Sequence, residues 1–189
     1  MGIDLGLKDF AATSDGAVIE AQKYYRRMQD KLAMSQRAGK KDRVKAIHAR
    51  ISARRKDFHH QLSTGLVNSY GAIFVGNVNA QALSQTGMAN SVLDAGWSAF
   101  RTMLLYKVAR AVVWVEEVDE AYSTQTCSVC ENRTGPRGQE GRGIREWTCG
   151  ECSMKHHRDV NAACNILAAG RRRLAVGFSV LTAQAAAEG

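Results

Sequence analysis

The chain has no apolar run that approaches the roughly 20 residues a membrane-spanning helix needs. It also begins without a signal-peptide pattern, because the strand-like segment GIDLG follows Met1 directly. Acidic residues are in the minority, with 18 Asp and Glu against 26 Lys and Arg and a net charge of +8. These deficits argue against a membrane protein and favour a cytoplasmic protein that binds a polyanion, most commonly nucleic acid. The alternative is a basic protein without such a partner.

Five cysteines in a chain of this kind argue against disulfides and for a metal site. Four of them form two CxxC pairs, Cys127 with Cys130 and Cys149 with Cys152. Two such turns can present four thiolates to one tetrahedral ion, and their spacing is typical of a zinc ribbon. The segment between the pairs contains the only proline and several glycines, so it buries little apolar surface and needs the metal as its core. We predict one structural Zn²⁺ here; the alternative is reduced cysteines in a core. Cys164 is expected to be a small buried side chain.

The N-terminal third predicts a β-meander followed by helices. Strands are expected near Ile3–Leu7, Phe10–Thr13 and Ala17–Ala21, with the turn signal SDG before the third. From Tyr24 to Leu66 apolar residues recur at intervals of three and four, which is typical of helix, and Gly39 marks a break.

Basic residues are concentrated in this helical region. Between Lys40 and Lys56 the only acid is Asp42, whereas an ordinary solvated helix face mixes both signs. Contact with nucleic-acid phosphates and plain solvation are equally good interpretations of this face. The candidate nucleic-acid-binding residues are Lys40, Lys41, Arg43, Arg50, Arg54 and Arg55. His59 and His60 are expected to be surface residues or neighbours of phosphates.

The middle of the chain predicts a strand, a helix and a second strand. The segments GAIFVGNVN and AVVWVEEV are near-continuous apolar runs, which favours buried parallel strands. Between them one helical stripe of core residues is expected: Leu93, Trp97, Phe100, Leu104 and Val108. The segment RDVNAACNIL predicts a last amphipathic helix that ends at Gly170, with a buried stripe of Val160, Ala163, Cys164 and Leu167.

Five segments together resemble the transposon-encoded OrfB/TnpB family: GIDLG, RRKDFHHQLS, STQTCSVC, WTCGEC and RDVNAACNIL. The resemblance implies an α/β, RNase H-like (RuvC-like) mixed sheet with flanking helices and an inserted zinc ribbon. It also implies kinship with type V CRISPR effectors and RNA-guided cleavage of DNA. The implied domains are 1–122 for the RuvC-like core with a helical insertion at about 24–66, 123–154 for the zinc ribbon, 155–172 for the final helix and 173–189 for a tail. The family's N-terminal region, which binds the guide RNA and the motif beside the target, has no counterpart here, so a guide RNA is expected to act through a missing region or a separate chain.

The same resemblance implies a magnesium site. Such enzymes hold two Mg²⁺ ions roughly 3.5–4 Å apart with carboxylates. Asp4 takes the place of the first-strand acid and Asp159 that of the last acid, although Asp159 also suits a helix N-cap. Where most relatives carry glutamate, this chain has Gly76, so the site has either lost its activity or gained another acid.

Glu120 and Glu117 are the two candidates to replace the missing acid, because both lie near the end of the neighbouring parallel strand. Alternation along a strand lets only one of them point at the site, and Glu120, which is nearer the carboxyl end, is favoured. The alternative is a merely polar strand exit. The expected functions are therefore a Mg²⁺-dependent endonuclease with Asp4, Glu120 and Asp159 as ligands, a nucleic-acid-binding protein without nuclease activity, or a decayed transposon remnant.

Overall fold

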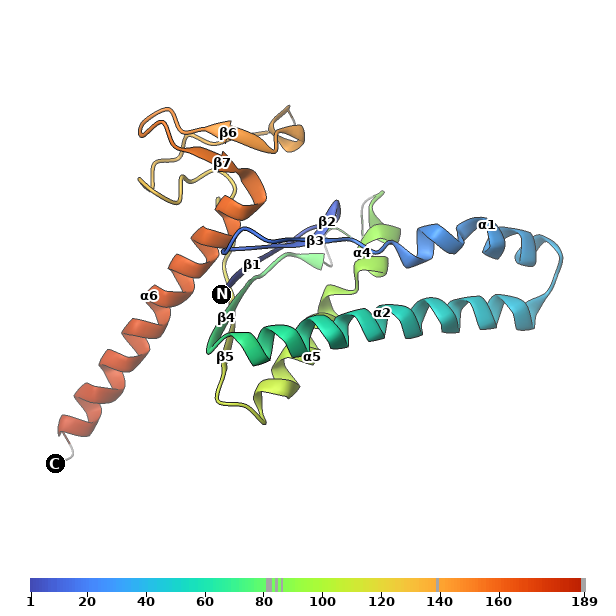
Figure 1. Cartoon of the computed structure of the whole chain (residues 1–189), viewed down its shortest axis with the longest axis horizontal. Coiled ribbons are helices and arrows are strands. Elements are labelled where there is room, and N and C mark those ends of the chain that lie inside the picture. Colours follow the sequence, from blue (N-terminus) through green and yellow to red (C-terminus); the bar gives the residue numbers. More distant parts are fainter. Residues whose placement is uncertain (81–82, 84, 86, 139, 188–189) are drawn as a thin grey trace.

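A mixed sheet forms the centre of the computed structural model, which describes residues 1–80, 83, 85, 87–138 and 140–187. Its strands run in the order β3-β2-β1-β4-β5 (Figure 1). β1, β2 and β3 pair antiparallel, whereas β1 pairs with β4 and β4 with β5 in parallel. The meander and the parallel pairing expected from the sequence are therefore confirmed. The strand bounds are β1 (Gly2–Leu5), β2 (Asp9–Thr13), β3 (Val18–Glu20), β4 (Ala72–Gly76) and β5 (Trp114–Val118).

Helices flank this sheet and extend beyond it. They are α1 (Tyr24–Arg37), α2 (Lys41–Ser69), α4 (Ala89–Ala95), α5 (Trp97–Val108) and α6 (Arg158–Ala187). None of the described helices is long and apolar enough to cross a membrane. α1 and α2 form a hairpin whose far end projects away from the sheet (Figure 1), and the break expected at Gly39 is confirmed, with φ +65°. Leu32, Ile47 and Ile51 form the small apolar core that joins the two helices.

Side-chain alternation gives the sheet two different faces. On β4, Ile73 and Val75 belong to the main core, which includes Leu66 of α2 and Phe100 of α5. Phe74 points the opposite way, into a second cluster with Val118 and Ile166 of α6. One face is therefore covered by α2 and α5, and the other by α6.

The first strand follows the same rule and brings its acid to the α6 face. Ile3 and Leu5 lie in the main core, so Asp4 between them points towards α6. α6 crosses β1 so closely that a Cβ on Gly2 would lie 2.1 Å from the carbonyl oxygen of Ala163. Glycine at position 2 thus permits the contact that brings the start of α6 to β1.

The helix expected between the two parallel strands is interrupted. Gly96 adopts the left-handed conformation (φ +65°) and separates α4 from α5. A Cβ there would lie 3.0 Å from both Arg55 Cδ and His59 Cε1, so glycine also permits close approach of α2. As a result Trp97, Phe100 and Leu104 are buried, but Leu93 is 65% exposed and its assignment to the core was wrong.

The last helix begins at Arg158 and continues past the glycine expected to end it. Residues 155–157 form strand β7 (Lys155–His157), which pairs with β6 (Glu146–Thr148) in the separate two-stranded sheet. The prediction of a C-terminal cap at Gly170 was wrong: Gly170 is buried against Phe74, and its lack of a side chain serves packing. The last residues of the expected tail, 188–189, lie outside the described part of the chain.

The buried face of α6 is also rotated about the helix axis relative to the expected stripe. Ala163 is buried as expected, but Val160, Cys164 and Leu167 are only half-buried. The most buried positions are Asn161, Ala162, Ala163 and Ile166, because α6 packs against both the sheet and the segment that leads into the cysteine-rich region.

Candidate active site

Three acids from different elements, together with Asp9 at the start of β2, line one cleft on the α6 side of the sheet. Asp4 lies within β1, Glu120 follows β5 by two residues, and Asp159 lies in the first turn of α6. The cleft has a volume of about 320 Å³ and is also lined by Arg145 and Arg158. The structure thus brings together the three acids expected from the sequence, although they are far apart along the chain.

Glu120 occupies the space that a side chain at position 76 would fill. A Cβ built on Gly76 would lie 2.3 Å from Oε2 of Glu120 and 3.0 Å from Cδ1 of Ile166. Carbon and oxygen atoms cannot approach that closely, so a larger residue at position 76 and the present position of Glu120 exclude each other. The carboxylate that follows the adjoining strand therefore lies where a side chain at position 76 would begin.

Glu117 points to the other face of the sheet. Its carboxylate accepts a hydrogen bond from Arg101 of α5 at 2.8 Å and remains 47% exposed. Val118, the next residue, packs in the cluster with Phe74 and Ile166 on the α6 face. Glu120 follows Val118 by two positions and shares its face, as alternation predicts.

Asn77 holds this strand exit in place. Its backbone N–H donates to the carbonyl oxygen of Val118 at 2.9 Å, which extends the β4–β5 pairing by one residue. Its side-chain Oδ1 accepts the N–H of Glu120 at 3.2 Å. Asn77 therefore fixes the backbone from which the Glu120 carboxylate projects.

The cleft is electrostatically unfavourable for carboxylates on their own. Burial, reinforced by the negative charges of Glu120 and Asp159, raises the pKa of Asp4 to about 8, although Arg158 and Arg145 oppose the shift. Burial, with a smaller contribution from Asp119, also raises the pKa of Glu120. Oε2 of Glu120 is buried and has no hydrogen-bond partner in the described part of the chain. Crowded carboxylates with an unsatisfied buried oxygen fit a hard divalent cation, which takes oxygen ligands.

The third acid, Asp159, is paired with an arginine. Arg145, from the cysteine-rich segment, forms a salt bridge with Oδ2 of Asp159. Among the described residues, the three acids do not form a group whose donor atoms all lie within 4.8 Å of one another. A cation bound by all three would require their carboxylates to move closer together.

The four paired cysteines do form such a close group. Sγ atoms of Cys127, Cys130, Cys149 and Cys152 all lie within 4.8 Å of one another. The hydroxyl of Thr134 donates to Sγ of Cys149 at 3.2 Å and, with backbone N–H donors, lowers the pKa of that thiol to about 6. Burial and hydrogen bonds with the other thiols instead raise the pKa of Cys152 to about 12, so it is the geometry of the four Sγ atoms that is compatible with a zinc ribbon.

The two CxxC turns repeat the same backbone geometry. Glu131 and Ser153 each follow the second cysteine of a pair, and each adopts a left-handed conformation, with φ +61° and +58°. Each donates its N–H to the carbonyl oxygen of the first cysteine, at 2.9 Å to Cys127 and 3.0 Å to Cys149. Non-glycine residues rarely adopt this conformation, so its appearance at both turns indicates two matched halves of one binding site.

Two asparagines that the sequence did not single out join the cysteine-rich segment to α6. Asn161, which is 2% exposed, accepts the N–H of Ser128 and donates to the carbonyl oxygens of Ser123 and Thr126. Asn165 donates to the same two carbonyls at 2.7 Å each. Their spacing of four residues places both on one face of the helix, which is the only sequence signal that could have identified them.

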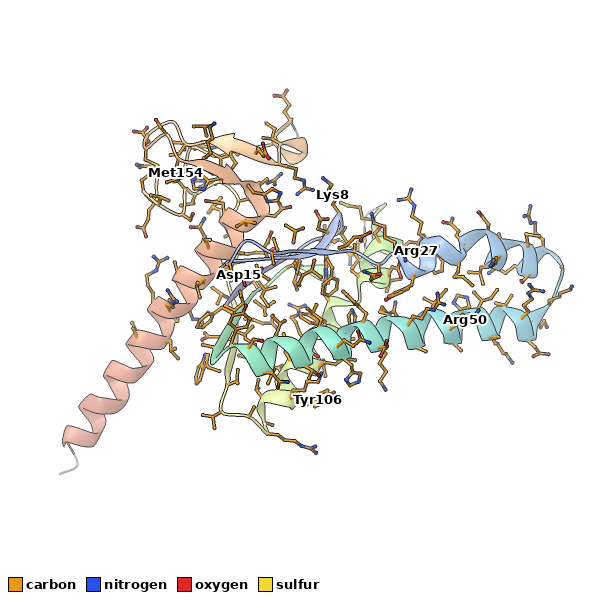
Figure 2. All side chains as sticks on the ribbon, viewed as in Figure 1. Lys8, Asp15, Arg27, Arg50, Tyr106 and Met154 are labelled. Carbon is orange, nitrogen blue, oxygen red and sulfur yellow. The ribbon has the colours of Figure 1, made fainter. Side chains whose placement is uncertain are left out.

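The basic residues of the helical hairpin are largely exposed. Lys40, Lys41, Arg43, Arg50 and Arg54 are exposed, and Arg50 lies on the part of α2 that faces α1 beyond the sheet (Figure 2). Arg55 is half-buried and donates to the carbonyl oxygen of Leu93 at 2.6 Å. The expectation of a surface position was wrong for His59, which is 1% exposed among the rings of Phe10, Phe58 and Phe100.

Two family profiles match consecutive parts of the chain. The OrfB_IS605 family, described as "Probable transposase", matches residues 1–86, and the Cas12f1-like TNB domain matches residues 97–166. The second match covers both CxxC pairs and Asp159, and the first covers Asp4 and Gly76.

Known proteins resemble the chain over nearly its whole length. It is 37% identical to a Streptomyces pristinaespiralis protein named "Putative RNA-guided DNA endonuclease", over 95% of this chain and 47% of that protein. A protein of Escherichia coli K12 with the same description, InsQ, is 29% identical over 95% of this chain and 51% of its own length. The cryo-EM structure of a Cas12f1-sgRNA-target DNA complex superposes with a TM-score of 0.65 and 19% identity, over 87% of this chain and 48% of that one, which supports the fold. The chain spans about half the length of the curated relatives it matches. It belongs to the OrfB/TnpB family of transposon-encoded proteins.

Proposed function

We propose that this chain is the Mg²⁺-dependent nuclease module of an RNA-guided DNA endonuclease, with an RNase H-like sheet and with Asp4, Glu120 and Asp159 as metal ligands. The observation that carries the proposal is the position of Glu120, whose carboxylate lies against Gly76 and points into the cleft of the other two acids. The strand order, antiparallel in its first half and parallel in its second, supports the RNase H-like assignment.

The residues of the cleft have different proposed roles, in metal binding, phosphate binding and positioning. Asp4, Glu120 and Asp159 would hold Mg²⁺, which when bound activates water and stabilises the leaving oxygen of a phosphodiester. Lys8, Arg145 and Arg158 line the same cleft and supply positive charge that attracts the phosphate backbone. Asn77 keeps Glu120 at the strand exit, and the cysteine cluster, which would hold Zn²⁺, fixes the segment that carries Arg145. DNA as substrate and a guide RNA as partner accord with the names of the relatives.

The two glutamates of β5 and its exit provide a matched test. Purified chain, with and without co-expressed RNA, is incubated with labelled single-stranded DNA and Mg²⁺. Glu120→Gln should lower the cleavage rate more than about 100-fold, since changes to groups that only support a metal ligand already cost 10–100-fold. Glu117→Gln should cut at nearly the wild-type rate, because Glu117 lies on the other face with Arg101.

A second pair of variants tests whether an acid at position 76 can replace Glu120. Glu120→Ala combined with Gly76→Glu returns the acid to β4 and should restore part of the cleavage lost in Glu120→Ala alone. Gly76→Glu with Glu120 still present should be inactive, because both side chains need the same space. Wild-type cleavage by Glu120→Gln, or inactivity of Glu117→Gln in a folded protein, would refute Glu120 as ligand.

The salt bridge between Arg145 and Asp159 favours a second candidate, a nucleic-acid-binding protein without nuclease activity. In that case Arg145 permanently neutralises the third acid. Binding of Mn²⁺, followed by electron paramagnetic resonance, separates the two functions: a nuclease should bind the ion and lose it in Asp4→Asn, whereas the second candidate should bind DNA but no Mn²⁺.

A further inference from the structure

A second cavity, outside the acidic cleft, lies between the start of α1, the turn that joins β1 to β2, and the helices α2 and α4. Its volume is about 490 Å³, within the range of roughly 300–1,000 Å³ that is common for small-ligand sites. Tyr24 and Phe58, both half-buried, contribute aromatic rings to its wall. The expected site residues include only one of its lining side chains, Arg55.

The charge of this cavity is strongly positive. Four basic side chains line it, Lys8, Lys23, Arg26 and Arg55, against a single acid, Asp94. Asp94 is already engaged, because its Oδ1 accepts the backbone N–H of Tyr25 at 2.9 Å. Lys8, Lys23 and Arg26 are exposed and form no ion pair with any residue that the structure describes. An anion at the rim therefore meets cations that no described carboxylate already pairs with.

Contacts between elements hold the cavity open in the absence of a ligand. Asp94 ties the start of α1 to α4, and Arg55 ties α2 to α4 through the carbonyl oxygen of Leu93. Lys23, directly before α1, adopts a left-handed conformation with φ +50°, which turns the chain from β3 into the helix. Because these contacts fix the wall, binding does not have to order it first.

The cavity adjoins the acidic cleft. Leu7, Lys8 and Met88 line both spaces, so the turn between β1 and β2 and the residue before α4 form part of the boundary between them. Figure 2 shows Lys8 at this turn, between the cysteine-rich region and the start of α1 where Arg27 lies. A polynucleotide strand that leaves the cleft past Lys8 would reach the aromatic wall.

We propose that this aromatic and basic cavity binds an unpaired nucleotide that neighbours the one in the acidic cleft. Its base stacks on the ring of Tyr24, and its phosphates contact Lys8, Lys23 and Arg26. Aromatic rings beside cations are the combination that proteins use for unpaired nucleic acid. The position of the nucleotide relative to the cleft rests on the proposed nuclease function, but its binding does not.

The test measures binding under conditions that do not allow cleavage. The whole chain is titrated, with Ca²⁺ in place of Mg²⁺, into a single-stranded DNA that carries 2-aminopurine, whose fluorescence rises when the base leaves its stack with other bases and changes again on a tyrosine. Tyr24→Ala should weaken binding about tenfold, the effect of losing one stacked base, and remove the fluorescence change. Tyr24→Phe keeps the ring and should behave like wild type.

Neighbouring arginines provide the control for charge. Arg26 lines the cavity, whereas the adjacent Arg27 is exposed and does not line it. Arg26→Ala should lower the slope of log affinity against log salt by about 0.7, the value for one phosphate contact to a single strand. Arg27→Ala should change it much less. Both positions are exposed, so these variants stay folded even if Tyr24→Ala, whose ring also packs on the hairpin core, does not.

Equal losses for Arg26→Ala and Arg27→Ala, or an unchanged fluorescence response in folded Tyr24→Ala, would overturn the proposal. Single-stranded RNA and duplex DNA are titrated alongside. Tighter binding of RNA than of single-stranded DNA identifies the nucleotide as part of an RNA strand. Duplex DNA that binds as tightly as single-stranded DNA would also contradict the proposal. Glu120→Gln separates the two proposals, because it should abolish cutting and leave the fluorescence response intact.

Discussion

Gly170→Ala should destabilise the protein although alanine is the better helix former. A Cβ at Gly170 would lie 2.1 Å from Cδ1 and 2.2 Å from Cγ of Phe74. Phe74 is 1% exposed and packed between Val118 and Ile166, so its ring cannot retreat. Overpacking costs about 1–3 kcal/mol, and contacts as short as 2.1 Å place this site in the upper part of that range, at about 2–3 kcal/mol. The change from glycine to alanine in a helix gains about 1 kcal/mol. The expected net loss in free energy of unfolding is about 1–2 kcal/mol.

Gly65→Ala is the matched control. Gly65 lies inside α2 and is exposed, and no described atom beyond its chain neighbours and its own helix backbone would lie within 4 Å of its Cβ, so the variant should gain about 0.5–1 kcal/mol. Thermal unfolding followed by circular dichroism should show Tm lowered by about 2–8 °C for Gly170→Ala and raised by about 1–4 °C for Gly65→Ala. In the background of Phe74→Leu the penalty at position 170 should shrink, because the smaller side chain leaves room.

A Tm for Gly170→Ala equal to or above that of the wild type would refute this account, since it would mean that α6 does not contact Phe74 at the observed distance. Equal destabilisation by both alanines would refute it as well, because the clash would then play no part.

Four further predictions concern titration, metal binding and side-chain contacts. Burial lowers the pKa of His59 to about 4, so the unfolded chain binds a proton that the folded chain does not, and the contribution of His59 should cost stability as pH falls below 6.5. Urea unfolding should show a loss of about 2 kcal/mol between pH 7 and pH 5 that is absent in His59→Gln. Because the pKa of Asp4 is raised to about 8, Mg²⁺ must displace a proton from Asp4 when it binds below that pH. Calorimetry should therefore find that the apparent affinity for Mg²⁺ increases about tenfold per pH unit up to about pH 8 and then levels off. An affinity that does not change with pH would contradict this prediction. Chelation should remove about one Zn²⁺ per chain and unfold residues 123–154 while hydrogen exchange in the central sheet stays slow, and purified protein without zinc would refute this. Asn161→Ala should lower stability by about 1 kcal/mol, since the N–H of Ser128 loses its acceptor while Asn165 still donates to the carbonyl oxygens of Ser123 and Thr126, whereas Val160→Ala should cost less.

The strands, the hairpin and the cysteine cluster could be predicted because their signals are local. Alternating apolar residues, the break at Gly39 and two CxxC pairs each depend on residues near one another in the chain. The same local reasoning placed Glu120 and Glu117 on opposite faces, and the structure has Glu117 with Arg101 and Glu120 against Gly76.

The remaining features depend on contacts between distant segments. A glycine in a helix ends it in many sequences, and only the position of Phe74 shows that Gly170 instead makes room. His59 carries the same local signal as an exposed histidine, but aromatic rings from β2, α2 and α5 enclose it. The salt bridge of Arg145 with Asp159 joins residues whose relation depends on the fold of the cysteine-rich segment, which no periodicity describes.

The cysteine-rich segment stands between Glu120 and Asp159 in the chain, and Asn161 and Asn165 fasten it to the same helix that carries Asp159. During synthesis, the first two acids can therefore reach their places on the sheet before the third has a defined position. If the cysteine cluster binds Zn²⁺ and the three acids bind Mg²⁺, as proposed, zinc binding would be a maturation step, and cells short of zinc would accumulate chains with an incomplete Mg²⁺ site.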